Sequence, residues 1–190
     1  MRVLGIDPGS RFMGYGVVDE ERGRLVHIGH GVLKVDPDAA LPLRLHDLFE
    51  QLTQVLSLFR PEAVSVEGVF THKNARSALI LGHARGIALL VAAQTGVEVH
   101  EYAPAQVKRA VGAGGAAGKD SVAKGVRTFL GLQEFERSDA SDALAVAICH
   151  LNHSRAAIPS TGKRGKGSKS KATGFAERLS PSFRRPEARG

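Results

Sequence analysis

The sequence predicts an α/β protein with a mixed five-stranded sheet and helices on both faces. Two observations lead to this fold class. Three strand-like segments follow one another near the N-terminus with only short turns between them, which predicts an antiparallel meander. Two further strand-like segments are each preceded by a segment with helical periodicity, which is typical of parallel strands joined by helices. An apolar fraction of 43% is sufficient for a buried core.

The meander is expected within the first 35 residues. Residues 1–7 form an apolar strand that ends at the turn Pro8-Gly9-Ser10. Residues 13–18 and 25–35 have strand composition, and residues 20–23 supply the polar turn between them.

The middle of the chain alternates helices and strands. Apolar residues recur at helical spacing over 40–59, and Arg60-Pro61 ends that helix. A short apolar strand follows at 63–66 and leads directly to Glu67. Residues 74–94 form a long helix, in which Gly82, Gly86 and several alanines should allow a neighbouring element to approach closely.

The remaining elements are expected in the order strand, short helix and two longer helices. Their predicted ranges are 97–102 for the strand, a short helix that begins at Pro104, and 119–130 and 138–152 for the longer helices, with a glycine- and alanine-rich loop at 112–118.

Charge divides the chain into two parts. The formal charge is +7 and the isoelectric point is about 9.9. Residues 153–190 hold ten Lys/Arg and two acidic residues, so the rest of the chain has a net charge of −1. We therefore predict one domain over 1–154 and a basic, low-complexity, disordered tail over 155–190. The tail is either an auxiliary DNA contact or a linker.

Within the domain, residues 73–127 hold eight basic and three acidic residues. This region is either a surface for phosphate or ordinary surface variation, and charge alone does not decide between them.

The chain shows none of the features of export. It opens on a strand-like segment without a signal-peptide pattern, and no uninterrupted apolar run approaches the roughly 20 residues of a membrane span. Cys149 is the only cysteine and lies in an apolar helical segment, where a small core residue is expected. We predict a cytoplasmic protein with no membrane partner.

Four acidic residues are the candidate catalytic group. Asp7 and Glu67 each end an apolar strand, so parallel neighbouring strands would bring both carboxylates to one edge of the sheet. Asp139 and Asp142 stand three residues apart at the start of an apolar helix and share one helical face. Taken singly, each acid has an ordinary explanation as a turn, a solvated strand end or a helix cap. Their order and placement together indicate a site.

Converging carboxylates suit a hard cation. Ionised acids that gather beside a core repel one another unless a cation neutralises them. Oxygen ligands of this kind favour Mg²⁺ or Mn²⁺, and two such ions per subunit can support phosphodiester hydrolysis. The sequence thus predicts a metal-dependent nuclease.

Five blocks of sequence resemble the RuvC family of Holliday-junction resolvases in order and spacing. They are Gly-Ile-Asp-Pro-Gly-Ser-Arg-Phe-Met-Gly-Tyr-Gly at 5–16, Glu-Gly-Val-Phe-Thr-His-Lys-Asn at 67–74, Leu-Gly-His-Ala-Arg-Gly at 81–86, 102–108, and Asp-Ala-Ser-Asp-Ala-Leu-Ala at 139–145. The resemblance covers about residues 1–152. It implies a ribonuclease H-like fold and a homodimer that makes paired, metal-dependent nicks in strands of like polarity at a four-way DNA junction. It also implies a role in homologous recombination and DNA repair with the RuvA–RuvB branch-migration complex.

The resemblance also implies roles for individual residues. Asp7, Glu67, Asp139 and Asp142 would be the catalytic metal ligands, although some relatives have histidine at the position of Asp142. The remaining positions would contact DNA: Phe70 by stacking on a base, Lys108 and Lys119 at phosphate, and His72, Lys73 and Arg76 as the polar members of a mobile DNA-contacting loop over 71–76.

Three other functions share some of these features. A ribonuclease H-like nuclease that cuts RNA–DNA hybrid would use the same acids. A sugar kinase or related ATPase also has an Ile-Asp-x-Gly motif after a strand, but it needs two such domains. A non-catalytic DNA-binding module would use the basic tail, but it leaves the four acids unexplained.

Overall fold

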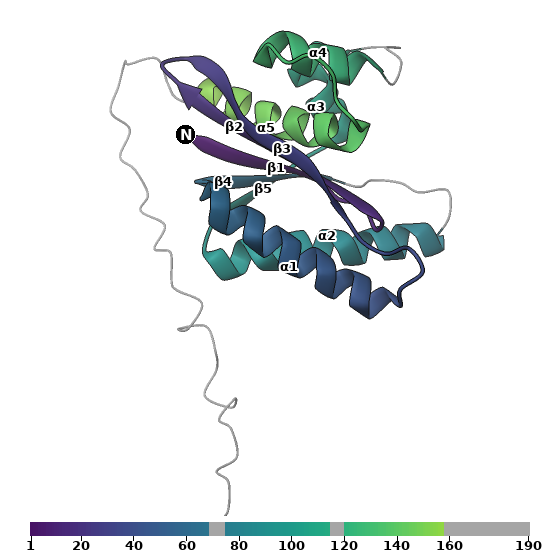
Figure 1. The fold of residues 1–190 in the computed structure, drawn as a ribbon. Coiled ribbons are helices and arrows are strands. Elements are labelled where there is room, and N and C mark those ends of the chain that lie inside the picture. Colours follow the sequence, from purple (N-terminus) through teal and green to yellow (C-terminus); the bar gives the residue numbers. More distant parts are fainter. Residues whose placement is uncertain (69–74, 115–119, 158–190) are drawn as a thin grey trace, which may run out of the picture. The chain divides into compact units, whose positions relative to one another are not determined.

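The computed structural model describes residues 1–68, 75–114 and 120–157, which form a five-stranded sheet with helices on both faces (Figure 1). The strand order is β3-β2-β1-β4-β5, and the first three strands are antiparallel while β1, β4 and β5 are parallel. The predicted fold class is confirmed. The strands are β1 (Arg2–Asp7), β2 (Phe12–Glu21), β3 (Arg24–Lys34), β4 (Ala63–Glu67) and β5 (Glu98–Tyr102).

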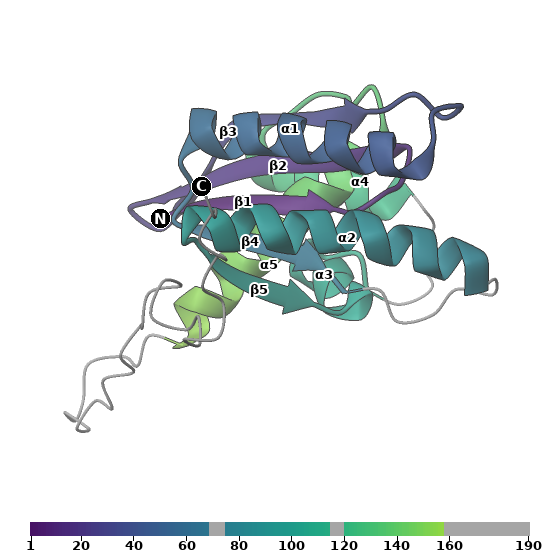
Figure 2. The same cartoon turned by 90° about the horizontal axis from the view of Figure 1, so that it is seen from below.

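The helices form one layer on each face of the sheet. The helices α1 (Leu41–Phe59) and α2 (Ala75–Thr95) lie side by side on one face (Figure 2). The opposite face is covered by α5 (Ser138–Ala157), against which the shorter helices α3 (Pro104–Ala110) and α4 (Asp120–Leu130) pack (Figure 1).

The turn between β2 and β3 consists of two residues, Arg22 and Gly23. Both have positive φ, 49° and 79°, as expected for the tight hairpin turn whose twist matches that of the strands. Because this turn is shorter than the predicted one, β2 continues to Glu21, three residues beyond its predicted end.

Alternation along the strands divides the core into two clusters. In β1, Leu4 and Ile6 pack toward α1 and α2, whereas Val3 packs toward α5. In β4, Val64 and Val66 likewise lie on the α1 side and Ala63 on the α5 side. Since side chains alternate between the faces of a strand, the residues that end both strands point toward α5.

Glycines let α5 lie directly on the sheet. A Cβ at Gly5 would come within 2.0 Å of the carbonyl oxygen of Ala143, and one at Gly14 within 2.0 Å of the carbonyl oxygen of Asp139. Side chains at these positions would push the helix outward. The helix is buried accordingly, with all residues from Ala143 to Cys149 fully inaccessible to solvent. The expectation for Cys149 as a core residue is confirmed.

The long helix α2 differs from its prediction in one respect. A Cβ added at Gly82 or Gly86 would have no atom of the described chain within 4 Å, so these glycines do not mediate close approach within the chain. The buried positions of α2 are Ala84, Ala88, Val91 and Ala92. By length and composition alone α2 could cross a membrane, with a mean hydropathy of 1.4, yet it packs against α1 and β5.

The compact unit spans Met1–Ile158. Within it α5 continues to Ala157, and Arg155 near its end forms an ion pair of 2.8 Å with Glu20. The division into a domain over 1–154 and a disordered tail stays a prediction, because residues 158–190 lie outside the described ranges.

Candidate active site

Two of the candidate acids lie at the same edge of the sheet. Asp7 ends β1 and Glu67 ends β4, and these strands pair in parallel with Ile6 opposite Val66. The next residue of each strand is therefore an acid, and alternation directs both side chains toward α5. This is the arrangement that the sequence predicts.

The other two acids come from the first turns of α5. Asp7 pairs across the sheet with Gly14, and the backbone of Asp139 lies directly over Gly14. The N-terminal end of α5 thus stands over the end of β1. Asp142 follows one turn later on the same helical face.

Three of the four acids, Asp7, Glu67 and Asp142, have a raised pKa. Burial, together with the charges of Glu67, Asp142 and Asp139, raises the pKa of Asp7 to about 8. Burial and then the charge of Asp139 raise the pKa of Asp142 to about 6, and burial and the charge of Asp142 raise the pKa of Glu67. Each shift opposes ionisation, so four ionised carboxylates require nearby positive charge.

Part of that positive charge comes from Lys108 on α3. Its ammonium group lowers the pKa values of Glu67 and Asp142, although burial keeps both above their usual range. Lys108 is exposed, and its charge acts on two of the acids. Lys108 thus lies near the acids, and its contact with phosphate stays a prediction.

Arg137 also reaches the acids, although no sequence motif had pointed to it. Its Nε donates a hydrogen bond of 3.0 Å to Oδ2 of Asp139. Its guanidinium carbon lies 3.7 Å from the ring centroid of Phe12, the first residue of β2. The one available signal in the sequence was an arginine two residues before a candidate acid.

The donor set suits a hard divalent cation. The carboxylates supply oxygen ligands without sulfur or imidazole, which favours Mg²⁺ or Mn²⁺ over zinc. Among the described residues, no three Asp, Glu, His or Cys side chains already stand around a common point as a complete ligand set. Besides burial, neighbouring carboxylates raise the pKa values of Asp7, Glu67 and Asp142, and a bound cation would offset that part of the shifts.

The predicted DNA-contacting residues are described only in part. Lys108 lies beside the acids, and Arg76 is exposed in the first turn of α2. Phe70, His72, Lys73 and Lys119 lie outside the described residues.

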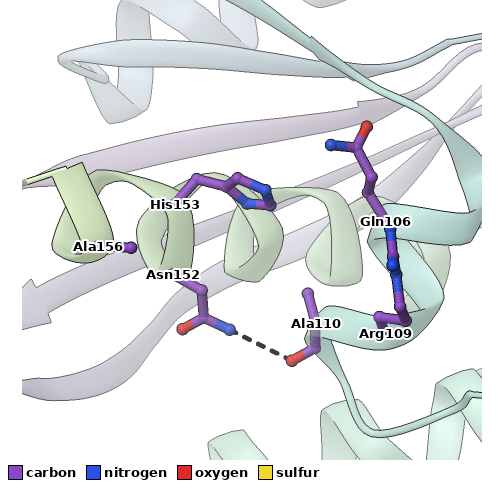
Figure 3. A pocket seen from close by; sticks show the side chains of 6 residues that line it. All are labelled: Gln106, Arg109, Ala110, Asn152, His153 and Ala156. Atoms are coloured by element: carbon purple, nitrogen blue, oxygen red, sulfur yellow. Dashed lines mark hydrogen bonds between the residues drawn. The ribbon is translucent and has the colours of Figure 1, made fainter.

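Cavities in the described part of the chain do not replace this site. A shallow cavity of about 430 Å³ lies between α3 and α5, lined by Gln106, Arg109, Asn152 and His153 among others (Figure 3). One of its polar groups already has a partner, since Asn152 donates a hydrogen bond of 3.2 Å to the carbonyl oxygen of Ala110. A second cavity, of about 460 Å³, is lined by Arg137, His30, Lys34 and Glu136 among others, and none of the four acids is among its lining residues.

Residues 3–150 match the family model for the crossover junction endodeoxyribonuclease RuvC. The chain is 66% identical to the RuvC protein of Myxococcus xanthus over the full length of both proteins. It is 51% identical to the RuvC protein of Trichlorobacter lovleyi, over 80% of this chain and 85% of that protein.

Solved structures give the same relationship. The chain superposes on Thermus thermophilus RuvC in complex with a Holliday junction substrate with a TM-score of 0.77 and 38% identity, covering 82% of this chain and 96% of that one. The yeast mitochondrial resolvase Ydc2 shares the fold, with a TM-score of 0.58, 16% identity and coverage of 81% of both chains. The ribonuclease H-like fold implied by the sequence motifs is thereby confirmed, and the chain belongs to the RuvC family of crossover junction endodeoxyribonucleases.

Proposed function

We propose that this RuvC-family endonuclease resolves Holliday junctions at the edge of the sheet where Asp7, Glu67, Asp139 and Asp142 meet, and that these acids hold two Mg²⁺ ions per subunit. Mn²⁺ is the expected substitute. The junction is cut by paired nicks at symmetric positions in strands of like polarity.

The observation that supports this site most strongly is the ionisation of Asp7. Burial and three neighbouring acids raise the pKa of Asp7 to about 8, so without a cation this carboxyl group is mostly protonated at neutral pH. A bound cation would favour the ionised form, which is the form that binds metal. A cation-binding function explains why the acids gather at a cost to stability.

The bound ions would activate water and stabilise the departing oxygen of the phosphodiester. The protein's own groups position the reacting strand. Lys108, whose charge reaches Glu67 and Asp142, is placed to bind the phosphate being cut and to stabilise its developing negative charge. Phe70 and Lys119, together with His72, Lys73 and Arg76, are the further proposed DNA contacts.

The proposal is tested by cleavage of an end-labelled synthetic four-way junction, with linear duplex and RNA–DNA hybrid alongside, each in Mg²⁺ and in EDTA. We expect symmetric, Mg²⁺-dependent nicks in the junction only. Cutting of the hybrid in preference to the junction would show that the protein is a ribonuclease H-type nuclease. Binding without cutting in Mg²⁺ would leave only a DNA-binding module.

A homodimer is part of the proposal, because paired nicks need two active sites on one junction. The outer face of α2 is the proposed contact surface. Leu79 and Leu90 are 66% and 48% exposed, and their spacing of about three helical turns places them on one face. Such apolar exposure is typical of a surface that another protein covers.

Replacing both Leu79 and Leu90 with glutamate should convert the dimer to a monomer in sedimentation experiments. Buried charges without partners oppose association strongly, so we expect the dissociation constant of the dimer to rise by at least about 100-fold. The variant should then nick the two strands independently of each other. The four acids of the site are not altered by these substitutions. Leu58→Glu on α1, where Leu58 is 74% exposed, is the matched control and should remain dimeric. A dimeric double variant would place the interface elsewhere.

The remaining parts of the proposal concern location and partners. A cytoplasmic enzyme acting on chromosomal junctions would work with the RuvA–RuvB branch-migration complex in recombination and repair. The basic residues beyond Ala157 would add a sequence-independent attraction to DNA that weakens with salt.

A further inference from the structure

We propose that Arg137 is a positioning residue that fixes the carboxylate of Asp139 for cation binding, and that the ring of Phe12 holds Arg137 in place. The inference rests on the proposed metal-binding role of the four acids. It adds two residues to that site which do not themselves bind the ion.

The geometry supports an orienting role. Nε of Arg137 donates a hydrogen bond to Oδ2 of Asp139. This hydrogen bond does not involve Oδ1, the other oxygen of the carboxylate. A carboxylate held through one oxygen is fixed in orientation and can still offer the other to a cation. Hydrogen bonds of this kind to metal ligands commonly set the ligand's orientation, and their loss weakens metal binding roughly 10- to 100-fold.

Phe12 makes the arginine a fixed group. The guanidinium carbon stands 3.7 Å from the ring centroid, within the range of a cation–π contact. The Arg137 side chain is 39% exposed and that of Asp139 is 23% exposed, so the pair is only partly screened by water. The contact with Phe12 favours a fixed position of Arg137 at Asp139 over a role in which the side chain swings out to bind DNA.

Both residues of the pair come from segments that the fold holds rigidly together. Phe12 begins β2 two residues before Gly14, and Arg137 lies two residues before Asp139. Because Gly14 and Asp139 are in direct backbone contact, the ring and the guanidinium are brought together by the same close approach that places α5. The contact between Phe12 and Arg137 therefore follows from the close packing of α5 against the sheet.

The test is Mn²⁺ binding by isothermal titration calorimetry on the full-length protein, without DNA. We expect Arg137→Gln to weaken Mn²⁺ binding by about 10-fold and Phe12→Leu to weaken it by a smaller factor. Arg137→Lys should restore part of the loss, since an ammonium keeps the charge but lacks the planar fork of donors. Arg24→Gln at the start of β3, at the far end of the hairpin, removes the same charge and should bind Mn²⁺ as the unaltered protein does.

Junction binding in EDTA separates this role from a direct DNA contact. We expect Arg137→Gln to bind the junction within about twofold of the unaltered protein, with thermal unfolding as the check that it is folded. Unchanged or tighter Mn²⁺ binding in Arg137→Gln would overturn the inference, as would loss of junction binding in EDTA.

The same titrations distinguish failure of this inference from failure of the proposed function. If the unaltered protein binds no Mn²⁺, the metal role of the acids fails and this inference fails with it. If the unaltered protein and Arg137→Gln bind Mn²⁺ equally well, only the positioning role of Arg137 fails, and the proposed function stands.

Discussion

Asp7→Asn should abolish junction cleavage while it raises the stability of the metal-free protein. Asp7 is the acid with the largest perturbation, so its loss removes a proposed ligand and we expect cleavage to fall on the order of 10²–10³-fold or more. Junction binding in EDTA should persist, because one negative charge facing phosphate is removed. Cleavage and filter-binding assays measure both effects. Asp47→Asn, at an exposed position of α1, should change neither.

The gain in stability follows from the direction of the pKa shift. In the unfolded chain Asp7 ionises near its ordinary pKa of 3.8, whereas in the fold its pKa is about 8. The folded state therefore holds a proton that the unfolded state has lost, and stability falls as pH rises from about 4 to about 8. The loss is at most about 6 kcal/mol, since the pKa rises from 3.8 to about 8 and one unit of pKa corresponds to about 1.4 kcal/mol.

Thermal unfolding in EDTA at several pH values checks this linkage. Asp7→Asn should have a higher Tm than the unaltered protein at about pH 8, and the two should converge near pH 4. Mg²⁺ should raise the Tm of the unaltered protein at the higher pH and have a weaker effect on the variant. A variant that is less stable than the unaltered protein at this pH in EDTA would contradict the assigned ionisation.

Gly14→Ala should damage fold and activity together. The added Cβ would stand 2.0 Å from the carbonyl oxygen of Asp139, which belongs to the backbone of α5 and cannot rotate away. The helix must move off the sheet, and overpacking of this kind costs about 3 kcal/mol. Since Asp139 and Asp142 move with the helix, we expect cleavage to be lost even at temperatures where the variant remains folded.

Differential scanning calorimetry and junction cleavage measure the two consequences. Ser57→Ala, at an exposed position of α1 away from the acids and from the proposed dimer contact, is the control. Alanine has the higher helix propensity, so Ser57→Ala should leave cleavage unchanged and leave stability unchanged or raise it by up to about 0.5 kcal/mol. Full activity in Gly14→Ala would mean that α5 does not need its present position.

The strands and the four acids could be predicted because their signals are local. Apolar runs that end at Asp7 and Glu67 define two strand ends, and the spacing of Asp139 and Asp142 defines a helical face. That the two strands are parallel neighbours followed from the helix between them. In the structure Asp7 and Glu67 end paired parallel strands and Asp139 and Asp142 lie in the first turns of α5, while their role as ligands stays a prediction.

Other features depend on contacts that sequence spacing does not encode. The close approach of α5 arises from Gly5 and Gly14, which in the sequence look like ordinary members of strands, whereas Gly82 and Gly86, expected to allow a close neighbour, have no such neighbour within the described chain. The contact between Arg137 and Phe12 joins residues far apart in the sequence. Such pairs become visible only when the register of strands and helix is known.

The complete burial of the middle of α5 has a consequence for how the site behaves in time. Backbone amides from Ala143 to Cys149 lie in the most protected part of the molecule, where hydrogen exchange generally requires global unfolding. Asp139 and Asp142 lie in the turns that lead into this segment, so the part of the helix that anchors them stays folded while ions bind and leave. The free energy of loading the site is therefore governed mainly by charge and dehydration.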